Sequence, residues 1–276
     1  MTLRVQRITQ PADFIALVQL RNRVYFDAGK SLSEHGESFE VLRDPSFHML
    51  GLYITSRSIL DYGTSTLVGA ITVRVPEVCS ATPFHWIPKE LQTPESFRHN
   101  QIPQPSECIE IGRLFLLPEF RGTQAVIELF RAVHRVLRTH QRKYLIITSD
   151  DRLQRLYRKI CFKVTGLSYE KKPRREDKPY LITVMKACHQ HFGVYGLLEG
   201  PLKWCLFMKP VIDSLQAEAR RAGSEYPLSW KEKLVYRIYS LFAPLASHAL
   251  PRPSIPQLSL KASRNVTNFS EKLFRV

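Results

Sequence analysis

The chain has 276 residues, of which 44% are hydrophobic and 11% aromatic. This composition is too apolar for a disordered protein, and the length is sufficient for one domain with an extension. Forty Lys and Arg residues against 25 Asp and Glu residues give a net charge of +15, spread along the chain. Such a charge favours either simple solubility or an acidic partner: a nucleic acid, an anionic lipid surface, a phosphorylated cofactor or an acidic carrier protein.

The cysteines and the amino terminus indicate a reducing compartment. Five widely separated cysteines without a CxxC pair predict neither a disulfide framework nor a zinc site. The nine histidines form no metal-ligand pattern, so we expect no metal. The first 14 residues lack a signal-peptide core, and no run of about 18 apolar residues occurs. We expect a cytoplasmic protein, either soluble or peripheral at the inner membrane face.

The first half of the chain predicts a helix, a loop and a hairpin. Apolar residues at helical spacing predict a helix within residues 12–26, and the polar stretch 27–46 predicts a loop. Residues 47–55 and 65–75 alternate in the manner of strands, and turn residues lie between them. These two strands should form an antiparallel hairpin.

The second half alternates strands and helices. Strands are predicted at residues 108–116, 143–150, 162–170 and 180–187, and helices at 124–139 and 151–160. Val126, Leu129, Phe130, Val133 and Leu137 should form the buried face of the first of these helices. The order of elements predicts an α/β fold with a mixed sheet.

The pattern changes after residue 190, so we divide the chain into a domain at 1–190 and a basic, mainly helical extension at 191–276. The extension holds twelve Lys and Arg residues against six Asp and Glu residues, a net charge of +6. Residues 229–243 predict a helix that begins with a capping box of Ser229 and Glu232. Its apolar face either packs on the domain or lies on an anionic membrane, and the Pro- and Ser-rich tail should be weakly ordered.

The segment from residue 107 to residue 137 raises the question of what its turn binds. A strand leads through "PEFRGTQAV" into a helix, so backbone N–H groups and the positive end of the helix dipole point at the turn. Gly122 allows close backbone approach and Arg121 adds a positive charge. The turn is either an anion site or an ordinary connection, and it lacks the glycines of a Walker loop.

A second segment, "DRLQRLYRKICFKVTG", places Tyr157 on a helix just before a strand. Its phenol is either a core aromatic residue or an acid that protonates a leaving group. Taken together, the two segments resemble the GNAT acyltransferases. In that superfamily a strand with a β-bulge leads into a turn that holds the pyrophosphate arm of coenzyme A, and a tyrosine in an "LYxKxGF"-like motif protonates the departing thiolate. Here Cys161 stands at the glycine of that motif, and Gln124 and Val126 stand at small positions of the turn.

Four places in the sequence carry a nearer resemblance: Arg21, Val24 and Tyr25 near the start, the acidic segment from Glu40 to Asp44, Gly69 followed by Arg74, and Glu110 with Arg113. The resemblance is nearest to the long-chain N-acyl amino acid synthases, the acyl-homoserine-lactone synthases and the ornithine-lipid acyltransferases. It spans residues 17–187 and implies a GNAT-like, mostly antiparallel central sheet flanked by helices. It also implies sites. The candidates for acceptor binding are Arg21, Tyr25, Asp44 and Arg74. The candidates for thioester and phosphate binding are Leu114, Phe115, Leu116, Arg121, Gly122, Thr123 and Gln124.

Glu110 and Arg113 form an "ExxR" pair on the bulged strand. Glu110 either receives the amine proton or holds an acceptor ammonium, and Arg113 either pairs with an acceptor carboxylate or fixes Glu110. A plain structural ion pair is the alternative for both. With Tyr157 as the acid, these three residues are the predicted catalytic set.

The predicted activity is transfer of a fatty acyl group from an acyl carrier protein or coenzyme A thioester to the amine of an amino acid or related molecule. Signal synthesis is disfavoured because the expected tryptophan is Ser31 and only Asp44 occupies the acidic pair. We expect no tightly bound cofactor. The alternatives are an acetyl-CoA-dependent acetyltransferase and a non-catalytic basic module for membranes or nucleic acid, although no RNP-like or zinc-finger motif occurs.

Overall fold

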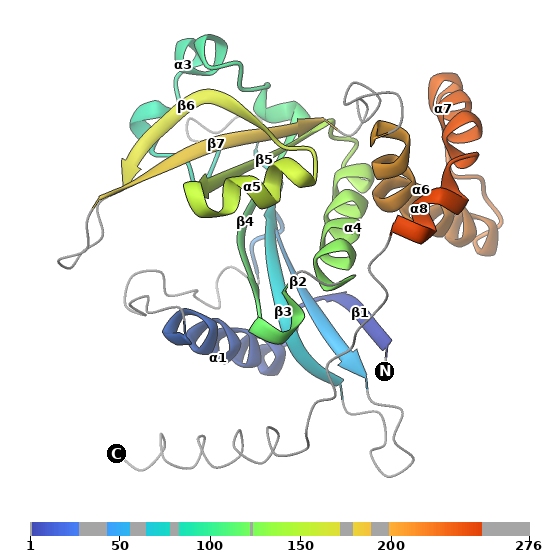
Figure 1. Ribbon diagram of the computed structural model, residues 1–276, viewed down its shortest axis with the longest axis horizontal. Coiled ribbons are helices and arrows are strands. Elements are labelled where there is room, and N and C mark those ends of the chain that lie inside the picture. Colours follow the sequence, from blue (N-terminus) through green and yellow to red (C-terminus); the bar gives the residue numbers. More distant parts are fainter. Residues whose placement is uncertain are drawn as a thin grey trace.

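The computed structural model describes residues 2–27, 43–55, 65–77, 83–121, 124–171, 179–188 and 199–249. Its centre is one seven-stranded sheet with helices packed against it (Figure 1). The strands run in the spatial order β1-β2-β3-β4-β5-β7-β6. Their bounds are β1 Thr2–Arg7, β2 Phe47–Thr55, β3 Ser65–Arg74, β4 Cys108–Leu116, β5 Tyr144–Asp150, β6 Lys163–Lys171 and β7 Tyr180–Cys188.

Only the β4–β5 pair of this sheet is parallel, and the other five pairs are antiparallel. The mixed, mostly antiparallel sheet predicted from the sequence is therefore confirmed. The hairpin of β2 and β3 is confirmed as well, but its turn at residues 56–64 lies outside the described residues. Strand β1 was not predicted, because it is short and pairs only with β2 at the edge of the sheet.

Three helices pack against the sheet. Helix α1 (Pro11–Asp27) contacts β3 and β4, α4 (Gln124–Thr139) contacts β1, β2 and β3, and α5 (Asp151–Lys159) contacts β5 and β7. The predicted apolar face of α4 is buried in the core throughout. The connection from β3 to β4 carries the short helix α3 (Pro94–His99) between the 3-10 turns η1 (Lys89–Leu91) and η2 (Pro105–Glu107), and η3 (Pro118–Phe120) follows β4.

The C-terminal helices form a further layer on α4. Helix α6 (Glu199–Arg221) packs on α4, and α7 (Trp230–Ser240) and α8 (Ala243–Ala249) pack on α6 (Figure 1). Trp204, Phe207 and Met208 of α6 belong to the same hydrophobic core as the sheet. The sequence did not predict α6, which contains Pro210.

The predicted capping box at Ser229 and Glu232 is confirmed. The helix predicted at 229–243 is α7, which ends at Ser240, and α8, which begins at Ala243, was not predicted. The tail from residue 250, expected to be weakly ordered, lies outside the described residues. Cys108, Cys161, Cys188 and Cys205 are not in disulfide bonds, and Cys79 is outside the described part of the chain.

Candidate active site

The sheet opens between β4 and β5. These strands pair in parallel up to Ile111 and Ile147. Beyond that point β4 continues along β3 to Leu116, and β5 continues along β7 to Asp150. Within the described strands, the backbone groups of β4 that point away from β3 beyond Ile111 therefore have no ladder partner in β5. An extended substrate arm can hydrogen-bond to an unpaired strand edge of this kind.

A β-bulge in β4 lies at this opening. The register between β3 and β4 shifts between Ala70 and Thr72. Arg113 has a φ of +54°, in the left-handed region that non-glycine residues seldom occupy. A bulge bends its strand and re-aims the groups beside it, so the bulged strand that the resemblance implies is present. The half-buried Leu114 and the buried Phe115 and Leu116, predicted to hold the thioester, follow directly.

Glu110 lies in β4 just before the opening and is completely buried, with 0% of its surface exposed. One carboxylate oxygen accepts a hydrogen bond of 2.6 Å from the backbone N–H of His85, and the other accepts one of 2.8 Å from the N–H of Trp86. Glu110 thus fixes the segment that follows β3 against β4. Each oxygen retains a second lone pair for another donor.

The environment of Glu110 brings the pKa of its carboxyl close to neutral pH. Burial raises the pKa of this carboxyl to about 7, although its two backbone hydrogen bonds and the Arg74 guanidinium act in the opposite direction. Arg74 stands directly opposite Glu110 in the register of β3 and β4. It donates a hydrogen bond of 2.7 Å to the Pro83 carbonyl, and its guanidinium lies 5.5 Å from the centre of the Phe47 ring. A buried carboxyl that titrates near pH 7 is suited to accepting a proton.

Trp86 covers β4 next to Glu110. A Cβ atom placed on Gly112 would lie 2.3 Å from Trp86 Cε2, so the indole ring rests on the bare glycine backbone. The Trp86 carbonyl accepts a hydrogen bond of 2.8 Å from the Tyr169 hydroxyl of β6. Burial raises the pKa of Tyr169 to about 12, and the charge of Glu110 adds to this effect.

Sequence reasoning missed His85, Trp86 and Tyr169. Only Gly112 gave a signal, because a glycine inside a strand often marks a site where another group approaches the backbone closely. The partner at such a position comes from a distant segment, and its identity is a tertiary fact.

Tyr157 lies on α5, which begins directly after Asp150, the last residue of β5. Its side chain is buried in the core, and its ring centre lies 5.8 Å from that of Phe162. Cys161, at the glycine of the tyrosine motif, has a φ of +75°. Its neighbour Phe162 donates a backbone hydrogen bond of 2.9 Å to the Tyr157 carbonyl. The helix therefore ends in a left-handed cap, the conformation in which glycine is preferred.

The predicted phosphate-binding turn is described only in part. Arg121 is exposed, and its Nε donates a hydrogen bond of 3.3 Å to the Leu116 carbonyl. Gly122 and Thr123 lie outside the described residues. Gln124 begins α4, and its Nε2 donates a hydrogen bond of 3.1 Å to Glu128.

The predicted acceptor-binding residues fall into two groups. Arg74 is near Glu110, and Asp44 stands three residues before Phe47, the register partner of Arg74. The Asp44 carboxylate accepts a hydrogen bond of 2.8 Å from the Ser46 N–H, a local turn at the start of β2. Arg21 is buried in α1, where its side chain donates to Asn22. Tyr25 is in the same helix, but its side chain is outside the described part.

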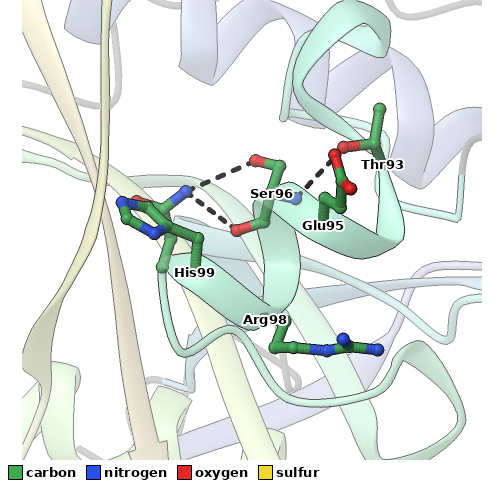
Figure 2. Close-up of a pocket in the computed structure, with 6 residues that line it drawn as sticks. Thr93, Glu95, Ser96, Arg98 and His99 are labelled. Atoms are coloured by element: carbon green, nitrogen blue, oxygen red, sulfur yellow. Dashed lines mark hydrogen bonds between the residues drawn. The ribbon is translucent and has the colours of Figure 1, made fainter.

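A shallow hollow on α3 is separate from these residues (Figure 2). The Ser96 N–H donates 3.1 Å to Thr93 Oγ1, and Asn100 Nδ2 donates 2.8 Å to the Ser96 carbonyl, so polar groups at the hollow bond to one another. The hollow is lined by Thr93, Glu95, Ser96, Arg98, His99 and Asn100.

The described residues contain no group of three or more His, Cys, Asp or Glu residues able to hold a metal ion. None of the helices in the described ranges is both long and apolar enough to span a bilayer.

Comparison with known proteins gives similarity of shape only. No protein-family model and no curated protein matches the sequence. Among solved structures, 68% of this chain superposes on 91% of FeeM, an N-acyl amino acid synthase from uncultured soil microbes, at 16% identity and a TM-score of 0.47. The same share superposes on 99% of Arabidopsis thaliana NAA60 in complex with a bisubstrate analogue, at 12% identity and a TM-score of 0.47.

A third similar structure is an acetyltransferase of the GNAT family from Streptococcus pneumoniae. It is 13% identical to this chain, which covers 99% of it with a TM-score of 0.44. All three scores are below 0.5, so the function of this chain has to be inferred from its own residues.

Proposed function

We propose that this protein is a GNAT-type N-acyltransferase that moves a fatty acyl group from a thioester to the amine of an amino acid or related small molecule. The observation that carries the proposal is the opening between β4 and β5, which begins where pairing ends at Ile111 and Ile147 and has a bulge at Arg113. Beside it lie a buried carboxyl that titrates near neutral pH and a helix that bears a buried tyrosine. Strand edge, base and acid are the three elements that aminolysis of a thioester requires.

In the reaction, the amine nitrogen attacks the thioester carbonyl carbon. The new C–N bond forms as the C–S bond breaks, one proton leaves the nitrogen, and one proton reaches the thiolate. The carbonyl oxygen gains negative charge during the attack, and backbone N–H groups of residues 114–116 would donate to it at the unpaired edge of β4.

Glu110 would accept the amine proton through a water molecule. Its pKa of about 7 makes it ionised in half or more of the molecules at or above neutral pH, and still basic enough to hold the proton. Tyr157 would donate its hydroxyl proton to the departing thiolate. Arg113, at the bulge, would pair with the carboxylate of the acceptor.

The acceptor would enter at the end of the sheet where β2 begins and β3 ends. Arg74 and Asp44 lie there, with Glu110 opposite Arg74. A cation and an anion at this end can bind the carboxylate and the ammonium of an amino acid. Arg21 and Tyr25, on α1, complete the proposed acceptor set.

The donor would be held by Arg121, Gly122, Thr123 and Gln124, whose turn precedes the N-terminus of α4, where backbone N–H groups favour a phosphate. Both coenzyme A and acyl carrier protein present a phosphopantetheine arm, and the proposal includes no tightly bound cofactor. We favour the carrier protein because α5 is strongly basic on its surface and a carrier is acidic. The exposed cations of α5 are Arg152, Arg155, Arg158 and Lys159. The proposed setting is cytoplasmic, with an anionic membrane surface as a further partner.

An assay with the purified protein, which follows release of the thiol from the thioester donor, tests this proposal. The protein is mixed with an amino acid pool and, in turn, with acetyl-CoA, a long-chain acyl-CoA and the same long chain on acyl carrier protein. We expect N-acyl amino acids to form, fastest with the acylated carrier, and this preference to weaken as salt is raised. Preference for acetyl-CoA would indicate the acetyltransferase alternative, and no N-acylation with any donor would contradict the proposal.

A further inference from the structure

Helix α7 has two sides with different surroundings. One side packs on α6: the ring centres of Tyr236 and Tyr239 lie 5.8 Å and 5.6 Å from that of Trp204, in edge-to-face contact. Arg138 of α4 forms an ion pair with Glu232 on this helix. These contacts fix the rotation of α7 about its axis.

The other side of α7, continued into α8, carries a row of exposed apolar side chains. Trp230 is 71% exposed and Leu241 is 78% exposed, the two highest exposed fractions among the large apolar residues of the described chain. Trp230, Leu234 and Ile238 are four positions apart, the spacing of one face of α7, while Leu241 is the C-cap of α7 and Leu245 lies in the separate helix α8. We name this set the apolar row: Trp230, Leu234, Ile238, Leu241 and Leu245.

Val235 and Phe242 follow Leu234 and Leu241 directly in the sequence, and the apolar pattern of 229–243 does not distinguish them from the apolar row. The structure separates them, because both pack against the core while the row faces outward. Packing and exposure are therefore properties of different sides of one helix, and a helix can dock on the protein with one side and leave the other for a partner.

The charges beside the apolar row are positive. Lys231, Lys233 and Arg237 are exposed on α7. Glu232 is the only acidic residue within 229–249, and its carboxylate already bonds to Ser229 in the capping box and pairs with Arg138. A helix with exposed Trp and Leu on one face and unopposed cations beside them is the type that lies at the interface of an anionic bilayer.

We propose that the apolar row and its three cations form a docking face for an anionic membrane surface. The charge disfavours two other occupants. The tail at 250–276 holds five Lys and Arg residues against one Glu, so it repels this face, and a second copy would bring the same cations together. The inference deepens the proposed function, since a lipid-like product would be released at the surface that the enzyme rests on. Vesicle binding requires no turnover, so it can fail or succeed independently of the activity.

The test is sedimentation of the full-length protein with vesicles of neutral phosphatidylcholine and with vesicles that also contain phosphatidylglycerol. We expect binding to the anionic vesicles only. Trp230→Ser combined with Leu241→Ser should reduce the partition coefficient by ~10-fold or more, because the two most exposed apolar side chains no longer enter the interface. Both side chains are mostly exposed, so the fold should be retained.

Two matched controls accompany these variants. Ile15→Ser combined with Leu181→Ser removes apolar side chains that are 50% and 48% exposed on other elements, and it should bind as the wild type does. The triple variant Lys231→Gln, Lys233→Gln and Arg237→Gln should lower the partition coefficient for anionic vesicles by about fivefold per charge. The same change at Arg152, Arg155 and Arg158 of α5 should lower it far less.

Three results would overturn the inference. The first is a wild type that sediments with neither kind of vesicle, and the second is an apolar-row variant that binds as well as its control. The third is a dimer that the apolar-row variant converts to a monomer without any change in vesicle binding, which would assign the face to a second copy.

Discussion

Arg74 and Glu110 face each other across β3 and β4, and the guanidinium lowers the pKa of the buried carboxyl. Replacing Arg74 by Gln removes that charge, so the pKa of Glu110 should rise above about 7. If ionised Glu110 is the base, the pH at which turnover is half-maximal should move upward by about one unit. The measurement is kcat against pH at saturating acceptor. Arg74→Lys keeps the charge and should stay near the wild-type midpoint, and equal midpoints in wild type and Arg74→Gln would contradict the coupling.

Glu110→Gln should change how stability depends on pH. The pKa of Glu110 is higher in the folded protein, about 7, than its ordinary 4.5, so the folded state binds more protons between these values. Its contribution to stability is therefore present below pH 4.5 and is lost as the pH rises to 7, by roughly 3 kcal/mol.

The difference between wild type and Glu110→Gln isolates this effect, because burial also lowers the pKa of both His48 and His134 to about 4 and gives the opposite slope. Denaturant unfolding from pH 4 to pH 8 measures both proteins. In Glu110→Gln, the amide NH2 will face the backbone N–H of His85 or Trp86. This mismatch lowers the stability by an amount that does not vary with pH. A difference that does not vary with pH would show that Glu110 has an ordinary pKa.

The strands of this sheet are visible in the sequence, but the contacts of Glu110 are not. Alternation is a local property, so β2, β3 and β4 could be predicted from their own residues. Strand β1, at the sheet edge, and α6, with its internal Pro210, gave weak local signals and were missed. The hydrogen bonds from His85 and Trp86 to Glu110 join residues about 25 positions apart in the sequence. The segment that donates them has no regular hydrophobic pattern. Pairings of that kind depend on the whole fold.

Tyr157→Phe should lower turnover about 100-fold or more while the protein stays folded. The ring and its contact with Phe162 are retained, and only the hydroxyl group, with the proton it would donate, is lost. The control is Tyr53→Phe on β2, which also removes a buried phenol hydroxyl but lies away from the opening. Turnover should be measured with thiol release, and loss of activity of equal size in both variants would indicate a general packing effect instead.

Gly112→Ala should destabilise the protein by about 1–3 kcal/mol, because its Cβ would overlap the Trp86 ring. The indole would have to move, and the backbone N–H donors of residues 85 and 86 would move with it. In a Trp86→Leu background the same substitution should cost much less, and chemical denaturation of the four proteins gives the coupling. Additive costs would show that Trp86 does not rest on Gly112.

The most direct test of the proposed activity is mass spectrometry of lipids from cells that express the protein, compared with cells that express Glu110→Gln. We predict new N-acyl amino compounds with long chains in the first sample and their strong depletion in the second at equal protein levels. Identical lipid profiles in cells with wild type, variant and empty vector would contradict the proposal that this chain is a long-chain N-acyltransferase.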